Sequence, residues 1–183
     1  MDLEKLEQAA RLIIEAVGDD PDREGLLETP KRFADMMAEQ FAYTAVSNED
    51  IAREFEKTFA TPENDMVVVK DISIFSHCEH HIALMYNMKA AVGYIPHGRV
   101  IGLSKIARIA DAVSKRFQIQ ERIGTDIRDI MKMVTGSPDI IVYIEGEHSC
   151  MTARGIKKPG TRTRTIASSG AFKEDSALRG EFM

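Results

Sequence analysis

The sequence of 183 residues lacks several features that would place it in a specialised class. It has no apolar run long enough to cross a bilayer, so we expect no membrane-spanning segment and no membrane partner. Its first residues are acidic and helix-like, without a basic flank or a cleavage site, which predicts a cytoplasmic rather than a secreted protein. Its two cysteines are too few for a disulfide scaffold.

The chain also lacks internal repeats, low-complexity tracts and a Pro/Gly-rich linker. Hydrophobic residues make up 44% and charged residues 29%, which is typical of a globular protein. A domain of this size buries roughly 70% of its unfolded surface, so a core can form without disulfides.

Charge is distributed unevenly along the chain. The net charge is −9 over residues 1–70 and +4 over 71–183, and residues 148–173 contain six basic side chains and no acidic one. This local basic field suits a small polyanion, although a solvated basic face is the alternative interpretation. Because the whole chain carries −5, we expect no nucleic-acid partner.

Apolar spacing predicts three helices in the first part of the chain. The first covers 3–17. The second begins with Thr29 as its N-cap and Pro30 in its first turn, and the third begins at Asn48 and ends near Lys57.

The rest of the chain alternates between strand and helix patterns. Strands are predicted over four segments: 66–74, 82–94, 139–147 and 162–166. Two helices separate the second strand from the third, one capped by Ser104 and one ended by Gly136, and a short helix is expected over 174–183. Helices followed by hairpin-like strand pairs indicate an α+β fold.

Histidines and cysteines are clustered. Four of the five histidines lie within three residues of a cysteine. One group is Ser76-His77-Cys78-Glu79-His80-His81, between two predicted strands, and the other is His148-Ser149-Cys150, after the third strand. His97 lies apart in a predicted turn, and we expect neither it nor His77 to have a role in the site.

The spacing of this cluster favours a zinc site. Cys78 and His81 have the C-x-x-H spacing that lets a thiolate and an imidazole reach one ion, and Cys150 can add a third ligand. Three protein ligands leave a position open for catalysis, whereas a fourth ligand from His80 or His148 would make a structural site. Spacing alone leaves that choice open, and inert buried thiols or a Cys78–Cys150 disulfide are further alternatives.

Five sequence blocks, in order, resemble the GTP cyclohydrolase I family. They are Thr29-Pro30-x-Arg32, Ser-x-Cys-Glu-His-His at 76–81, Val-Ile-Gly-Leu-Ser-Lys-Ile at 100–106 with Arg108, Gln-Glu-Arg at 120–122, and His-Ser-Cys at 148–150 with Ala-Arg-Gly at 153–155. The similarity extends from about residue 5 to the C-terminus, and it is to the zinc-containing form with both cysteines present.

The resemblance implies a tunnelling fold, in which an antiparallel sheet with paired helices over 61–183 follows an N-terminal helical region over 1–60. It implies a homo-oligomer, a decamer of two pentamers. It also implies hydrolysis of GTP to 7,8-dihydroneopterin triphosphate and formate, the first step of tetrahydrofolate biosynthesis. In that reaction zinc-activated water attacks guanine C8, the purine ring opens, and an Amadori rearrangement and ring closure follow.

The resemblance also implies residue roles. One zinc ion (Zn2+) per subunit would be held by Cys78, His81 and Cys150, with His80 and His148 as acid–base catalysts. The substrate-binding residues would be Glu121 on the guanine edge, Gln120 beside it, and, around the triphosphate, Ser104, Lys105, Arg108, Arg154 and, from a neighbouring subunit, Arg32. Without the motif, we would interpret Lys105 and Arg108 as part of a solvent-exposed helix face. We would interpret Glu121 as an acidic residue that stabilises the first turn of its helix.

Two kinds of rival remain. One is another tunnelling-fold enzyme on a purine or pterin, against which the His-His pair after Cys78 argues. The other is a structural zinc module that binds a partner protein. Zinc content and GTP turnover, measured together, separate these alternatives.

Overall fold

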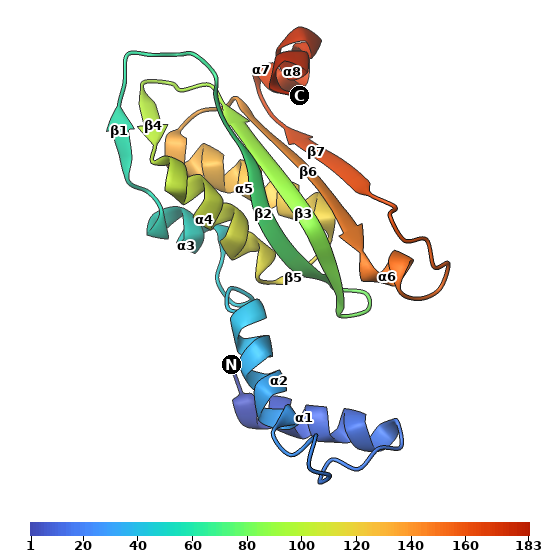
Figure 1. Cartoon of the computed structure of the whole chain (residues 1–183). Coiled ribbons are helices and arrows are strands. Elements are labelled where there is room, and N and C mark those ends of the chain that lie inside the picture. Colours follow the sequence, from blue (N-terminus) through green and yellow to red (C-terminus); the bar gives the residue numbers. More distant parts are fainter. The chain divides into compact units, whose positions relative to one another are not determined.

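The computed structural model describes all 183 residues, which form two compact units, Met1–Ala42 and Tyr43–Met183 (Figure 1). Residues 43–60 belong to the second compact unit. Arg116 explains this because its guanidinium donates to the backbone carbonyls of Tyr43 and Val46 and to the side chain of Asn48. The separate functional roles of the two regions remain a prediction. None of the helices has both the length and the apolar character needed to cross a membrane.

The first unit is a pair of packed helices, α1 (Leu3–Ala16) and α2 (Thr29–Gln40). The side chain of Asp2 caps α1 by accepting from the backbone N–H of Lys5. The predicted cap of α2 was wrong by one residue, because Glu28 is the N-cap and Thr29 is the first helical residue. Pro30 lies in the first turn as predicted, where its missing N–H costs no hydrogen bond.

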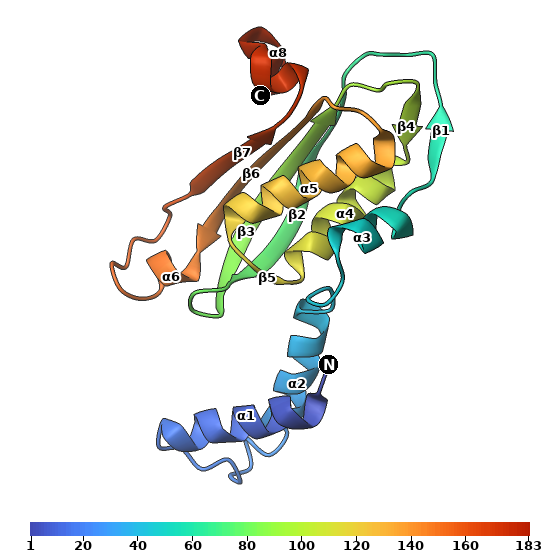
Figure 2. The ribbon, with the colours of Figure 1, turned by 180° about the vertical axis from the view of Figure 1, so that it is seen from behind.

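The second unit is built on a five-stranded sheet (Figure 2). In spatial order, its strands are β5 (Phe117–Gln118), β2 (Val67–Cys78), β3 (Ala83–Tyr94), β6 (Ile140–His148) and β7 (Thr163–Ser168). Neighbouring strands are antiparallel except for the short β5, which runs parallel to β2. The helices α4 (Leu103–Ser114) and α5 (Gln120–Thr135) cover one face. This arrangement, preceded by N-terminal helices, confirms the expected fold class.

Smaller elements surround this sheet. They are α3 (Asn48–Glu54), the two-stranded sheet of β1 (Thr58–Ala60) and β4 (Arg99–Ile101), α6 (Ser149–Thr152), α7 (Ala171–Glu174) and α8 (Ser176–Phe182). The sequence patterns did not predict β1, β4 or β5, which are too short to show a period. The predicted terminal helix is two short helices, α7 and α8.

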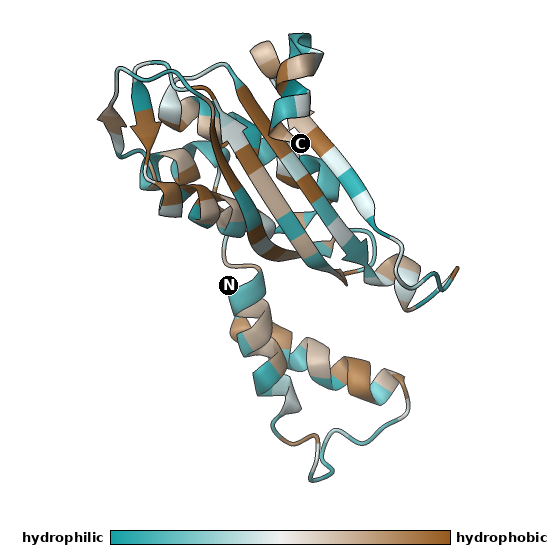
Figure 3. Cartoon of the chain, turned by 45° about the horizontal axis from the view of Figure 1, so that its top comes forward, coloured by the Kyte–Doolittle hydropathy of each residue, from teal (hydrophilic) through white to brown (hydrophobic).

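The core lies between the two covering helices and the sheet. The apolar residues of α4 and α5 face the strands, and several are fully buried, among them Ile106, Ile109, Val113, Ile123, Ile127 and Ile130. Each side chain of this size contributes about 1.5–3 kcal/mol when buried. Figure 3 shows the corresponding apolar and polar stretches along the strands. Gly136 ends α5 with φ 71°, a left-handed conformation that glycine adopts without strain, as predicted.

Two further predicted caps were wrong by one or two residues. Ser47 caps α3 by accepting from the N–H of Asp50, while the Asn48 amide is bound to Asp126 and Arg116. Gly102 is the N-cap of α4, so Ser104 is its second residue. Both predicted residues still lie in first turns, where unpaired backbone N–H groups are exposed.

His97 lies in a turn, as predicted, and its side chain also contacts a residue outside that turn. Its Nε2 lies 2.8 Å from Oδ2 of Asp139, while Oδ1 of Asp139 accepts from the N–H of Ala171 at 2.7 Å. The turn after β3 is thereby connected, through the start of β6, to the C-terminal helices.

Candidate metal centre and active site

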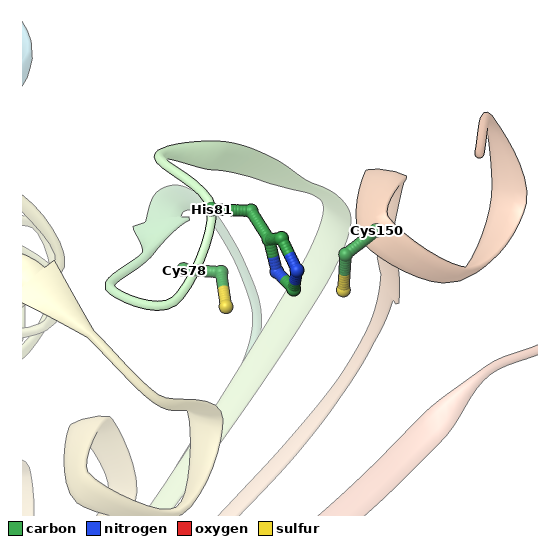
Figure 4. Close-up of side chains that lie close together, drawn as sticks. All are labelled: Cys78, His81 and Cys150. Carbon is green, nitrogen blue, oxygen red and sulfur yellow. The ribbon is translucent and has the colours of Figure 1, made fainter. Parts of the chain in front are cut away.

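Three potential metal ligands meet at one end of the sheet (Figure 4). Cys78 is the last residue of β2, His81 lies in the turn between β2 and β3, and Cys150 lies in α6. One ligand atom from each lies within 4.8 Å of the others. Sulfur and nitrogen ligands of a tetrahedral zinc ion are roughly 3.5–3.8 Å apart, so small side-chain adjustments would bring all three into coordination.

The chemistry of these donors fits zinc. Burial, followed by the charge of the neighbouring Cys78, raises the pKa of the Cys150 thiol. Two adjacent thiolates repel each other, and a divalent cation between them offsets that repulsion. Two sulfurs and an imidazole form a soft donor set that leaves one tetrahedral position for water or substrate.

Hydrogen bonds hold the element that carries Cys150. The hydroxyl of Ser149 donates to the carbonyl of Leu84 at 2.7 Å, and the hydroxyls of Tyr86 and Thr152 are 2.9 Å apart. These contacts attach both ends of α6 to β3, the strand that begins just after His81. The two halves of the metal cluster are therefore fixed to the same strand.

The turn that carries His81 is held from the other side by α5. Arg122 donates to Oε2 of Glu79, and also to Oε1 of Gln118 at 2.7 Å and the carbonyl of Phe117 at 3.2 Å. The motif Gln-Glu-Arg at 120–122 thus includes a residue that supports the metal turn, a role that the sequence did not suggest.

Both proposed acid–base histidines lie beside the cluster. Nδ1 of His80 is 3.6 Å from Sγ of Cys78, and its ring meets that of His81 edge-on with centroids 6.5 Å apart. His148 ends β6, two residues before Cys150. Burial lowers the pKa of His148, and the charge of Glu121 partly offsets this effect.

Gln120 and Glu121 occupy different environments at the start of α5. Glu121 is exposed, whereas Gln120 is only 1% exposed. Oε1 of Gln120 lies 2.8 Å from Nε2 of His148, and Nε2 of Gln120 donates to acceptors on β6 and β7. Both polar atoms of the Gln120 side chain therefore have hydrogen-bond partners, and one of these partners is His148.

The three α4 residues expected at the triphosphate lie away from the metal cluster. Ser104, Lys105 and Arg108 belong to the first two turns of α4, and the last residue of the helix, Ser114, accepts from the hydroxyl of Ser76 at 2.7 Å. Because a helix of 12 residues is about 18 Å long, Ser104 is separated from the metal end by roughly 15 Å. Within one chain, the start of α4 and the metal cluster therefore lie apart.

The two remaining expected cations differ in position. Arg154 is exposed just after α6, close enough for its charge to act against the burial that raises the Cys150 pKa. Arg32 belongs to the first unit, where it pairs with Glu28 on the same helix.

Part of the basic stretch near the C-terminus is neutralised within the chain. Arg162 and Arg164 both donate to the carboxylate of Glu145, at 2.8 and 2.5 Å. Hydrogen bonds from Arg162, Tyr143 and Arg164 lower the pKa of Glu145 to about 2. Sequence reasoning missed Glu145, because it lies 17 residues before Arg162 and only the pairing of β6 with β7 brings them together.

His77 is buried in β2, and burial lowers its pKa.

Comparison with known proteins found relatives that match this chain over nearly its whole length. A chain from Clostridium acetobutylicum named GTP cyclohydrolase 1 is 58% identical, covering 100% of this chain and 96% of its own. Proteins of the same name from Clostridium beijerinckii and Clostridium botulinum (strain Kyoto / Type A2) are 56% and 54% identical, covering 99% and 100% of this chain and 95% and 96% of their own. Among solved structures, an archaeosine synthase QueF-Like in the apo form aligns with a TM-score of 0.46 at 18% identity, over 60% of this chain and 96% of that one.

The family model described as GTP cyclohydrolase I matches residues 6–183, which include both compact units and every residue of the metal cluster. Relatives more than half identical over nearly the whole chain support the same assignment. The chain belongs to the GTP cyclohydrolase I family.

Proposed function

We propose that this chain is a zinc-dependent hydrolase that converts GTP to 7,8-dihydroneopterin triphosphate and formate, the entry to tetrahydrofolate biosynthesis, in the cytoplasm. One observation carries the proposal: a Cys-His-Cys cluster has two further histidines beside it, in a chain that matches this family over residues 6–183. A purely structural zinc site would not require the second histidine pair.

The metal would be held by Cys78, His81 and Cys150, one ion per subunit. When bound there, zinc lowers the pKa of a coordinated water toward about 7 and so supplies a nucleophile for guanine C8 at neutral pH.

The residues around the cluster would bind the base and move protons. Glu121, exposed beside His148, can accept paired hydrogen bonds from the guanine N–H groups. His148 gives a proton to N7, which makes C8 more electrophilic, and His80 moves protons during cleavage of the C8–N9 bond and hydrolysis of the formamide. Amadori rearrangement and ring closure then complete the pterin.

The triphosphate would be bound by residues that one chain separates. Ser104 and Lys105 lie at the end of α4 that is far from Cys78, and Arg108 lies near the middle of this helix. A second copy that presents its own α4 to this metal end would complete the site, so we propose a homo-oligomer, with a decamer of two pentamers as the family arrangement. Arg154 of the metal end, and Arg32 of a neighbouring copy, would add further cations.

Zinc content and formate release, measured on the same samples, test the proposal. We expect one zinc per wild-type chain and one formate per pterin formed from GTP. The variant Cys150→Ser should lose zinc and at least about a thousandfold in turnover, roughly 4 kcal/mol of transition-state stabilisation. Circular dichroism checks that the variant remains folded.

Two results would contradict the proposal. If Cys150→Ser kept wild-type turnover, Cys150 would not be a ligand of a catalytic ion. If the wild type bound zinc, formed no pterin and unfolded on chelation, the cluster would be a structural module instead.

A further inference from the structure

The Gln120 side chain connects one helix, α5, to two strands, β6 and β7, at one buried point. It belongs to the first residue of α5 and is 1% exposed. Its Nε2 lies 3.1 Å from the carbonyl of Ile144 on β6, 3.0 Å from the carbonyl of Thr163 and 3.3 Å from the hydroxyl of Thr165 on β7. Its Oε1 lies 2.8 Å from Nε2 of His148.

These surroundings determine which way the amide points. Two of the three groups around Nε2 are backbone carbonyls, which only accept hydrogen bonds. Exchanging the amide oxygen and nitrogen would place an oxygen against both carbonyls and leave a buried N–H toward His148, at a cost of several unmade hydrogen bonds. The oxygen of Gln120 therefore faces His148.

The amide orientation in turn determines the protonation of the imidazole. An amide oxygen has no hydrogen to donate, so Nε2 of His148 must carry the hydrogen of this contact. Nδ1 is then the ring nitrogen that takes no part in this contact.

We propose that Gln120 is a positioning residue that holds His148 with a proton on Nε2 and so keeps the imidazole in one orientation at the metal end of the sheet. The role of His148 in the reaction rests on the proposed function, whereas the tautomer rests only on these hydrogen bonds. The sequence resemblance placed Gln120 beside Glu121 in the guanine pocket. The proposal instead gives Gln120 the role of a support that contacts His148.

The arrangement suits a group that must keep its orientation through several proton transfers. Gln120 is the first residue of α5, and its amide is hydrogen-bonded to β6 and β7. The imidazole of His148 is therefore held by a group that is itself fixed to the sheet. Supporting partners of this kind typically contribute 10- to 100-fold to activity.

The tautomer can be measured by 15N NMR of zinc-loaded protein labelled at histidine, without substrate. His148 is identified by comparison with His148→Gln. We expect a proton on Nε2 of His148 in the wild type. In Gln120→Met, which keeps side-chain length but removes both hydrogen-bonding groups, this pattern should change to a mixture of tautomers. We expect kcat to fall by about 10- to 100-fold while the KM for GTP stays within about twofold.

Gln118 offers a matched control. It is also 1% exposed, its amide nitrogen donates to the carbonyl of Val113 and to Asp126, and its amide oxygen accepts from Arg122, so none of its side-chain partners is His148. Gln118→Met should lower the melting temperature to a similar extent and leave the His148 pattern unchanged.

Three outcomes would overturn the proposal: a wild-type His148 protonated on Nδ1 alone, an unchanged His148 pattern in Gln120→Met, or a rise in KM without a fall in kcat. The wild-type spectrum tests the tautomer even if Gln120→Met does not fold. If the wild type shows the expected tautomer but releases no formate from GTP, the proposed function fails and the assignment of the tautomer stands.

Discussion

The two ends of α4 differ in how completely one chain builds them. At its C-terminal end, the metal ligands, both histidines and their supports from α5 and β3 are packed or hydrogen-bonded within a single chain. In its N-terminal half, Ser104 and Arg108 are exposed and have no hydrogen bond from their side chains to another residue of the chain.

This difference separates two physical requirements. Proton transfer and metal binding need atoms held to within tenths of an ångström, which a rigid sheet and short hydrogen bonds provide. Binding a flexible triphosphate needs several cations, which long exposed side chains provide once a partner surface brings them close. We infer that the first requirement is met by folding and the second by assembly.

Complementation between two damaged chains tests this contrast with the largest expected effect. We expect Cys150→Ser, and a chain carrying both Lys105→Met and Arg108→Met, each to be nearly inactive alone. Mixed oligomers should recover about a quarter of the wild-type turnover, because random assembly pairs an intact metal end with an intact α4 in that fraction of sites. Formate release from co-expressed chains measures the recovery.

A second mixture provides the control for this experiment. Cys78→Ser and Cys150→Ser damage the same end, so their mixed oligomers should recover nothing. If mixed oligomers of the first pair form, as native mass spectrometry would show, and still recover no activity, then one chain supplies both ends.

The support of the metal turn by Arg122 predicts an effect of intermediate size. Arg122→Met removes the hydrogen bonds to Glu79, Gln118 and Phe117, so the turn carrying His81 should become less ordered. We expect zinc affinity to fall by about tenfold, measured by competition with a chelating dye. Arg128→Met on the same helix, which loses only a pair with Asp129, should keep wild-type affinity, and an equal loss in both variants would contradict the role of Arg122.

The smallest expected effect concerns Glu145, away from the metal end. Its folded pKa, lowered from 4.5 to about 2, means that its ionised form stabilises the fold above pH 4.5 and that this contribution disappears as pH falls toward 2. Because the pairs with Arg162 and Arg164 are partly exposed, we expect Glu145→Gln to lower the melting temperature by only a few degrees at pH 7. The difference from the wild type should vanish near pH 2, and a difference that grows on acidification would contradict this interpretation.

Much of the fold was predictable because it depends on local periodicity. The apolar spacing of α4 and α5 and the alternation along β3 gave these elements nearly at their observed bounds. The cap at Asn48 was misplaced by one residue, because Ser47 and Asn48 are successive polar residues that fit the same pattern. The caps at Thr29 and Ser104 were misplaced by one and two residues, because α2 and α4 begin after Glu28 and Gly102, which make no side-chain cap hydrogen bond. The strand that ends at Cys78 continued four residues past its predicted end, since its last residues pair with β3 and β5.

By itself, the sequence determined the chemistry of the metal site: two thiols and an imidazole in soft-ligand spacing, with two more histidines nearby. Only the tertiary structure decided how other groups are used. Gln120 lies 24 residues before Ile144 and 28 before His148, and no local pattern connects them. Spacing along a chain shows which residues are neighbours within a helical turn or a strand. The orientation of His148 by Gln120, and the pairing of Arg162 and Arg164 with Glu145, depend on residues that meet only when the chain folds.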